Sequence, residues 1–151
     1  MENLSTKRKG DISEMRSMAK LTELGADLYT PYGENTRIDI IADIDGTLLR
    51  LQVKTARDCG DKIKFNCSSR RSNLSETTSE HYKGEVDAFL VFHSEGDEKG
   101  SFYFVPIEEA TKTAMSLRLT GTKNNQTKNV NIAKNYKLTK ETLYGYSERF
   151  K

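Results

Sequence analysis

Residues 37–56 read RIDIIADIDGTLLRLQVKTA, two stretches of strand-forming residues on either side of Asp45-Gly46. This arrangement is a strong hairpin signal, because Asp and Gly both tolerate the positive φ angles of a tight turn. We therefore predict strands over residues 37–43 and 47–56. Side chains alternate across a strand. One face of the second strand is expected to carry Leu49, Leu51 and Val53, and the other Arg50, Gln52 and Lys54.

A helix is predicted before this hairpin, over about residues 12–24. Asp11-Ile-Ser-Glu14 has the spacing of a capping box, and Gly25 can end the helix. At 100° per residue, Glu14 shares an arc of this helix with Met18 and Leu21, so its carboxylate is expected to face the sheet. The apolar residues that recur at helical intervals are Ile12, Met15, Met18, Ala19, Leu21 and Leu24.

The segments after the hairpin predict a mixed sheet flanked by helices. Residues 68–80 are rich in Ser and Arg and are interpreted as a loop or short helix. Residues 86–94 and 101–106 predict strands, and residues 107–117 a helix. The strands outnumber the helices available for parallel crossovers, so the fold class is α/β with a mixed sheet. The length of 151 residues suits one domain, 1–151.

Charge is distributed unevenly along the chain. Residues 1–110 contain 15 Lys and Arg against 20 Asp and Glu, whereas residues 111–151 contain 9 against 2. A basic segment on an acidic body attracts a polyanion by releasing its condensed counterions, which makes nucleic acid the first partner to consider. An ordinary solvated basic surface is the alternative.

The sequence argues against a membrane protein, a disulfide framework and a hydrolytic triad. No stretch approaches the roughly 20 apolar residues that span a bilayer, and the first residues lack the apolar run of a signal peptide. We expect a cytoplasmic protein with no membrane association. Cys59 and Cys67 form no CxxC pair and are expected to be reduced thiols. His81 and His93 have no nucleophile motif near them.

Polar groups on the hairpin are the candidates for chemistry. Asp39 lies among isoleucines, where an unpaired carboxylate is costly to bury, and it can face Gln52 and Lys54 across the ladder. With Glu14 from the helix, this cluster offers oxygen ligands that suit Mg²⁺. Each residue also has an ordinary structural interpretation: Glu14 as part of a capping box, Asp39 as a strand-edge charge, and Gln52 and Lys54 as solvated strand residues.

The order and spacing of these residues resemble the PD-(D/E)XK nuclease superfamily. The matching blocks are Glu14 on a first helix, PYGENTRIDIIAD with Asp39, and LRLQVKTA with Gln52 and Lys54. More narrowly, the chain is similar to the subgroup that includes a cyanobacterial group I intron homing endonuclease, whose relatives share the fold of archaeal Holliday-junction resolvases. The later blocks EVDAFLVFH, FYFVPIEEA and SLRLTGTKNNQTKNVNIAKNY extend the resemblance over roughly residues 10–136.

The resemblance implies metal-dependent hydrolysis of a DNA phosphodiester on a restriction-endonuclease-like core of order αβββαβ. It implies that Asp39 is a metal ligand, with Glu14, Gln52 and the Val53 carbonyl completing the site, and that Lys54 lies beside the attacking water. Mg²⁺ is the expected cation and Mn²⁺ a substitute. The superfamily usually has Asp or Glu where this chain has Gln52, and a neutral amide brings no negative charge to the cation.

Contacts to DNA are expected from a basic segment at about residues 118–137 and from a second, weaker candidate region. Lysines suit phosphates, and Asn or Gln suits adenine edges. The candidate DNA-binding residues are Arg70, Arg71, Lys123, Asn124, Asn125, Gln126 and Lys128. A flexible loop is the alternative interpretation for the basic segment.

Three functions stay open from the sequence: a double-strand endonuclease of the homing or mobile-element type, a structure-selective Holliday-junction resolvase, and a non-catalytic DNA-binding module of the same fold. A small chain with one active site is expected to cut both strands as a two-fold symmetric homodimer or homotetramer.

Overall fold

A computed structural model describes residues 1, 3–73, 76–82, 84–95, 99–121 and 128–151. Within this part of the chain, the main sheet has the order β1-β2-β3-β8-β9. Only β3 and β8 are parallel, so the predicted mixed α/β class is confirmed. These strands are β1 (Asp27–Tyr29), β2 (Ile40–Ile44), β3 (Thr47–Thr55), β8 (Ala88–His93) and β9 (Ser101–Pro106).

The hairpin of β2 and β3 forms as predicted. Ile44 pairs with Thr47, and the turn residues Asp45 and Gly46 have φ angles of 50° and 86°. Glycine adopts a positive φ angle without steric cost, and Asp tolerates it. Alternation along β3 buries Leu49, Leu51 and Val53. The first strand begins at Ile40, three residues later than predicted. This late start separates Asp39 from the regular ladder.

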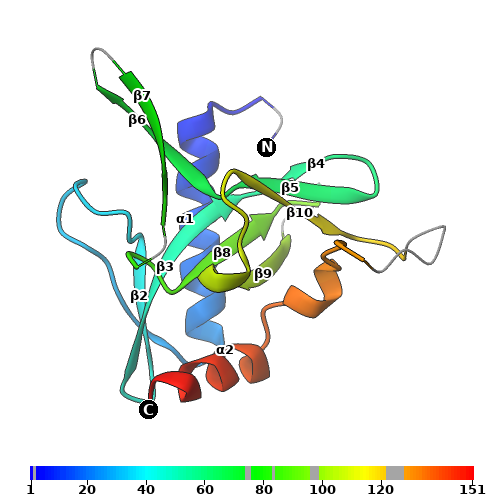
Figure 1. Cartoon of the computed structure of the whole chain (residues 1–151). Coiled ribbons are helices and arrows are strands. Elements are labelled where there is room, and N and C mark those ends of the chain that lie inside the picture. Colours follow the sequence, from blue (N-terminus) through cyan, green and yellow to red (C-terminus); the bar gives the residue numbers. More distant parts are fainter. Residues whose placement is uncertain (2, 74–75, 83, 96–98, 122–127) are drawn as a thin grey trace.

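Helix α1 (Thr6–Glu23) lies across one face of the sheet (Figure 1) and begins earlier than predicted. Its N-cap is Ser5, whose hydroxyl accepts a hydrogen bond from the Arg8 N–H, so the predicted capping box at Asp11 is wrong. Gly25 does follow the end of the helix, with φ of 95°. The side chains buried along α1 are Ser13, Ser17 and Leu21, whereas Met15 is 63% exposed. Small serines let the helix pack closely on the sheet, and apolar spacing alone could not reveal this.

The chain between β3 and β8 forms strands where the αβββαβ order places a helix. These are β4 (Arg57–Asp58), β5 (Lys62–Asn66), β6 (Ser68–Asn73) and β7 (Glu76–His81). The predicted loop or short helix over residues 68–80 is therefore wrong. Strands β6 and β7 pair antiparallel over six residue pairs, and their hairpin projects from the body of the protein (Figure 1). The residues of these two strands are mostly polar, so no apolar alternation in the sequence indicates a strand pair here.

The predicted helix over residues 107–117 is also wrong. Only Ile107–Glu109 forms a short 3₁₀ helix, η1, and the chain then enters β10 (Ala114–Arg118), which pairs with β5. Met115 and Leu117 are buried at a spacing of two residues, which is the period of a strand. The remaining elements are η2 (Ala133–Tyr136), α2 (Lys140–Ser147) and η3 (Glu148–Phe150).

Apolar cores cover both faces of the main sheet. One packs Leu21 of α1 and Leu143 of α2 against the alternating residues of β2 and β3. The other packs β5 and β10 against Phe89 and Val91 of β8. None of the helices in the described residues contains an apolar stretch of the length that spans a bilayer.

Candidate active site

The candidate site lies where β2 begins beside β3. Asp39 immediately precedes β2, and its backbone N–H donates to the Leu51 carbonyl at 2.9 Å. Its Oδ2 atom accepts two hydrogen bonds, from Gln52 Nε2 at 2.5 Å and from the Val53 N–H at 2.7 Å. The Asp39 carboxylate thus accepts a hydrogen bond from the Val53 N–H of β3, which lies outside the part of β3 that pairs with β2. Gln52 faces Asp39 as the strand register predicts.

Glu14 reaches the same region from α1. Its neighbour Ser13 is fully buried, and the Ser13 and Thr55 hydroxyls are 2.6 Å apart, which ties this turn of α1 to the end of β3. Burial raises the pKa of the Asp39 carboxyl to about 6. The negative charge of Glu14 adds to that increase, while the Val53 N–H and the charge of Lys54 oppose it. Burial also raises the pKa of Glu14, with a contribution from Asp11.

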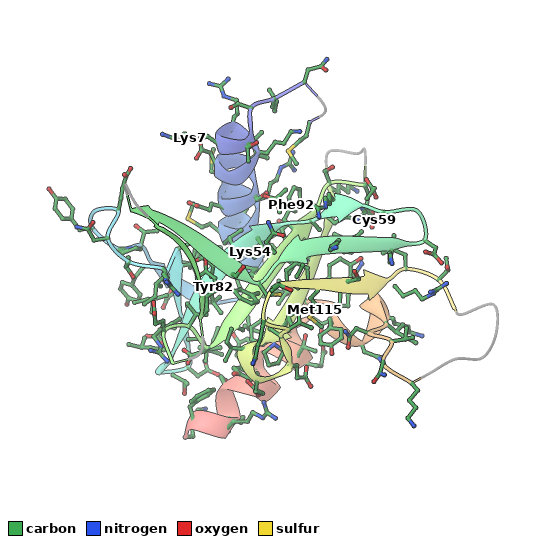
Figure 2. All side chains as sticks on the ribbon, turned by 45° about the horizontal axis from the view of Figure 1, so that its top comes forward. Lys7, Lys54, Cys59, Tyr82, Phe92 and Met115 are labelled. Carbon is green, nitrogen blue, oxygen red and sulfur yellow. The ribbon has the colours of Figure 1, made fainter. Side chains whose placement is uncertain are left out.

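Lys54, the fourth member of this cluster, is held by an aromatic side chain. Its Nζ donates to the Tyr82 hydroxyl at 3.1 Å and lies 4.5 Å from the centre of the Tyr82 ring (Figure 2). The Phe89 ring centre is 5.4 Å away. The ammonium therefore sits over aromatic faces that attract a cation without neutralising it.

The donor set suits a hard cation that keeps much of its water. Two carboxylates, those of Asp39 and Glu14, are partly buried, and burial is the main cause of the raised pKa of each, while the charge of Glu14 also acts on Asp39. The Gln52 amide adds a neutral oxygen. Among the described residues, no group of three or more acidic, His or Cys side chains gathers. Such a set fits Mg²⁺, which binds through one or two carboxylates and several waters.

The structure places the predicted DNA-binding residues only in part. Lys123, Asn124, Asn125 and Gln126 lie outside the described residues, as do the side chains of Arg70 and Arg71 on β6. Lys128 is exposed in a turn. Lys137, at the end of the predicted basic segment, lines a hollow together with Arg16 and Lys20 of α1. Those two positions lie roughly opposite Glu14 around the helix, so this end of the segment does not face the candidate site.

Comparison with known protein families matches residues 4–139 to the family described as PD-(D/E)XK endonuclease. The chain belongs to the PD-(D/E)XK endonuclease family. The structure of a bacterial homing endonuclease, I-Ssp6803I, is similar to this PD-(D/E)XK chain with a TM-score of 0.76 and 20% sequence identity. The similarity covers 97% of this chain and 96% of the other, and it supports the fold. The sequence has no match among curated proteins.

Sequence reasoning missed two residues near this PD-(D/E)XK cluster: Tyr82, which contacts Lys54, and Arg37, which contacts Tyr82. Tyr82 follows a polar strand pair and carries no local signal beyond being an aromatic residue in a polar region. Arg37 lies within the quoted hairpin stretch, and its guanidinium carbon is 4.9 Å from the centre of the Tyr82 ring. Only 8% of Arg37 is exposed. The sequence shows that Arg37 lies two residues before Asp39. It does not show that Arg37 is buried, and burial is the property that marks this residue.

The metal-free protein is expected to lose stability as the pH rises from about 4 to about 6. Folding raises the pKa of Asp39 from its ordinary value of 3.8 to about 6, so the folded state favours the protonated carboxyl. The stabilisation is present below the unfolded pKa and is lost as the pH passes the folded pKa. Urea unfolding of the parent and Asp39→Asn across this range measures the effect. The variant should show the weaker pH dependence, and equal slopes would contradict the raised pKa.

Proposed function

We propose that this chain is a metal-dependent endonuclease that hydrolyses phosphodiester bonds of DNA, with Mg²⁺ as the cation and Mn²⁺ able to replace it. The observation that carries the proposal is the Asp39 carboxylate, held by Gln52 and Val53 beside the charges of Glu14 and Lys54. A carboxylate in this setting is costly unless a cation compensates it. Membership of the endonuclease family supports the same conclusion.

Each residue has a role that its position suits. Asp39 and Glu14 would hold the cation, with the Gln52 amide oxygen and the Val53 carbonyl as neutral ligands. When bound, Mg²⁺ lowers the pKa of a coordinated water and polarises the phosphate. The Lys54 ammonium stabilises the negative charge that accumulates on the phosphate oxygens during attack. The aromatic surface under Lys54 excludes water from one side of that ammonium and strengthens its electrostatic effect.

The substrate we propose is double-stranded DNA, cut by an enzyme of the homing or mobile-element type. Likeness to the structure of a bacterial homing endonuclease favours this choice over a junction resolvase. Incubation with Mg²⁺ and three substrates tests it: a plasmid library, a four-way junction and single-stranded DNA. Discrete duplex fragments support the proposal. Symmetric cuts confined to the junction would indicate a resolvase, and binding without cleavage in Mg²⁺ or Mn²⁺ would indicate a DNA-binding module.

We further propose that the enzyme acts as a homodimer or homotetramer with two-fold symmetry. One active site in a chain of 17.1 kDa cleaves one strand, and a symmetric pair of active sites can cleave both strands in a single binding event. The basic segment at 118–137 supplies candidate contacts to phosphates, through Lys128 and the lysine at 123. Arg70 and Arg71 on the projecting hairpin are the second proposed contact region.

Gln52→Glu is expected to tighten Mg²⁺ binding and to lower the stability of the metal-free protein. The parent amide donates to Asp39, whereas a carboxylate at position 52 has no proton to donate and repels Asp39. A bound divalent cation reverses that repulsion. Calorimetric Mg²⁺ titration, with thermal melts in the presence and absence of Mg²⁺, measures both effects. The control is Asn66→Asp, which adds a carboxylate at an exposed position of β5. Unchanged Mg²⁺ affinity in Gln52→Glu would place residue 52 outside the metal site.

A further inference from the structure

Two cations, those of Arg37 and Lys54, contact the ring of Tyr82. Tyr82 is 97% buried, and its hydroxyl accepts a hydrogen bond from Lys54 Nζ at 3.1 Å. The Lys54 ammonium and the Arg37 guanidinium lie 4.5 and 4.9 Å from the centre of its ring. Arg37 is two residues before Asp39, and Lys54 is two residues after Gln52. One aromatic ring therefore contacts β3 through Lys54 and the segment that leads into β2 through Arg37.

The ring itself is held by the core. Tyr82 packs edge-on against Phe89 of β8, with ring centres 5.3 Å apart. The backbone N–H groups of Glu85 and Val86 both donate to the Tyr82 carbonyl, at 3.0 and 3.2 Å. The Glu85 carboxylate also lies 3.3 Å from Arg37 Nε. The turn after Tyr82 therefore fixes the ring and one of its two cations together.

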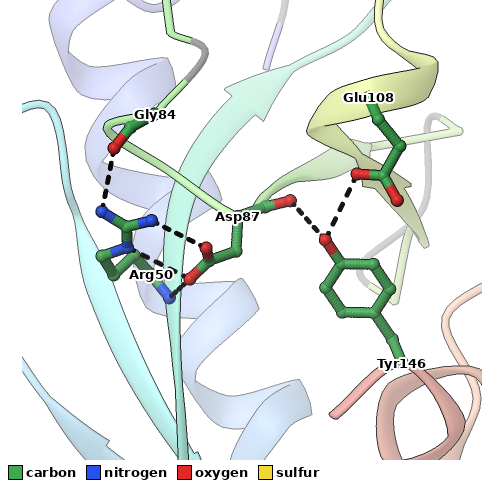
Figure 3. Close-up of polar contacts among 5 residues, drawn as sticks. All are labelled: Arg50, Gly84, Asp87, Glu108 and Tyr146. Carbon is green, nitrogen blue, oxygen red and sulfur yellow. Dashed lines mark hydrogen bonds and ion pairs between the residues drawn. The ribbon is translucent and has the colours of Figure 1, made fainter. Parts of the chain in front are cut away.

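A network of polar contacts anchors this turn to the rest of the fold (Figure 3). Arg50 of β3 donates to the Gly84 carbonyl at 3.0 Å and forms a two-point ion pair with Asp87, with its Nη2 atom 2.9 Å from Oδ1. The Tyr146 hydroxyl of α2 donates to the Asp87 carbonyl at 2.9 Å. Arg50 and Lys54 lie on the same face of β3. The strand that carries Lys54 therefore also holds the turn that carries Tyr82.

We propose that Tyr82 is a positioning residue that fixes the Lys54 ammonium for phosphodiester hydrolysis. A lysine side chain has four rotatable carbon–carbon bonds, and ordering it costs conformational entropy. The Tyr82 hydroxyl and ring order the lysine before DNA binds, because the hydroxyl accepts a hydrogen bond from the ammonium and the ring attracts its charge. The proposal rests on the proposed function, since it assigns Tyr82 to the reaction through Lys54.

Tyr82→Phe tests the hydroxyl without emptying the core. The ring and its packing against Phe89 remain, and only the acceptor for Lys54 is removed. Single-turnover cleavage at saturating enzyme is expected to fall about tenfold, in the range for a lost hydrogen bond to a charged group. Affinity for DNA without metal is expected to stay unchanged, because Tyr82 is buried and contacts no phosphate.

Tyr103→Phe is the matched control. Tyr103 is also buried in the second core, and its ring centre lies 5.9 Å from a lysine ammonium, that of Lys137. It shares the chemistry of Tyr82 but not the contact with Lys54. Its cleavage rate is expected to equal the parent's. An equal loss in both variants would indicate a general effect of removing a buried hydroxyl and would overturn the proposal.

The double variant separates positioning from structural support. In a Lys54→Ala background there is no ammonium to position, so adding Tyr82→Phe should cause no further loss of cleavage. A structural role predicts the same tenfold loss in both backgrounds. An equal rate for Tyr82→Phe and the parent, or an undiminished loss in the Lys54→Ala background, overturns the assignment.

An NMR measurement without DNA or metal keeps this result separate from the proposed function. The Lys54 Cε–Hε protons lie in the ring current of residue 82, and this ring stays in place in Tyr82→Phe. A change in the Lys54 chemical shift therefore reports that the side chain moves once the hydroxyl no longer holds it, and the other lysines should not change. If the parent cuts no DNA, the proposed nuclease function fails, whereas the NMR result still decides whether Tyr82 holds Lys54. An unmoved Lys54 resonance overturns the inference even in an active enzyme.

Discussion

Replacing Asp39 with Asn is expected to lower DNA cleavage by at least about 10²-fold while leaving the fold and DNA binding intact. The change is nearly isosteric, and the amide oxygen can still accept from Gln52 and from the Val53 N–H. Only the negative charge is lost. That charge is what Asp39 would contribute to a cation, whereas it repels a phosphate when no cation is present. Metal-free binding of DNA should therefore equal or exceed that of the parent.

The matched control for this variant is Asp43→Asn on the same strand. Asp43 accepts a hydrogen bond from the Gly46 N–H in the hairpin turn and lies at the opposite end of β2 from Asp39. It should cleave as the parent does. Cleavage rates with Mg²⁺, thermal melts and metal-free binding are measured together for the three proteins. Parent-like cleavage by Asp39→Asn would refute the metal site proposed at this position.

Lys54→Ala is expected to lower cleavage to a similar extent, by at least about 10²-fold, for a different reason. The Lys54 ammonium stabilises charge that develops on the phosphate during attack, so its removal raises the barrier more than it weakens binding of the ground state. Single-turnover rates should fall while DNA affinity changes little. Mg²⁺ affinity should not fall with them, because Lys54 is not a ligand.

Lys62→Ala provides the comparison for lost positive charge, because Lys62 is exposed at the start of β5. A nonspecific effect of charge on DNA binding would appear in both lysine variants and would depend on salt. A catalytic effect appears only in Lys54→Ala and persists at saturating enzyme. If Asp39→Asn and Lys54→Ala both unfold at lower temperature and lose DNA binding in proportion, the cluster supports the structure and the catalytic proposal is wrong.

The β2–β3 hairpin could be predicted because its signals are local. Asp45-Gly46 fixes the turn, and the turn fixes the register of the two strands. That register places Asp39 opposite Gln52. The burial of alternate residues on β3 follows from the same periodicity. The family resemblance rested on these positions, and the match over residues 4–139 confirms it.

The elements that were predicted wrongly have sequence signals that are weak or that compete with one another. The start of α1 depends on the Ser5 cap, while Asp11 and Glu14 offered a second acceptable cap farther along. The segment 107–117 contains apolar residues that fit a helix, but β10 pairs with β5, and that partner is 48 residues or more away in sequence. Strand pairing of this kind overrides local preference, because it satisfies backbone groups and buries Met115 and Leu117 together.

The sequence predicts the hairpin, the mixed α/β class and the family, because each depends on residues close together or on a pattern of spacing. It also predicts that Asp39, Gln52 and Lys54 share one region. The folded protein is needed to see that Tyr82 lies against Lys54 and that the Ser13–Thr55 contact brings Glu14 to the same place. Those neighbours are 28 and 42 residues apart along the chain. Their meeting depends on how α1 packs and on the path between β3 and β8, and both are set by the burial of the two cores rather than by any local preference.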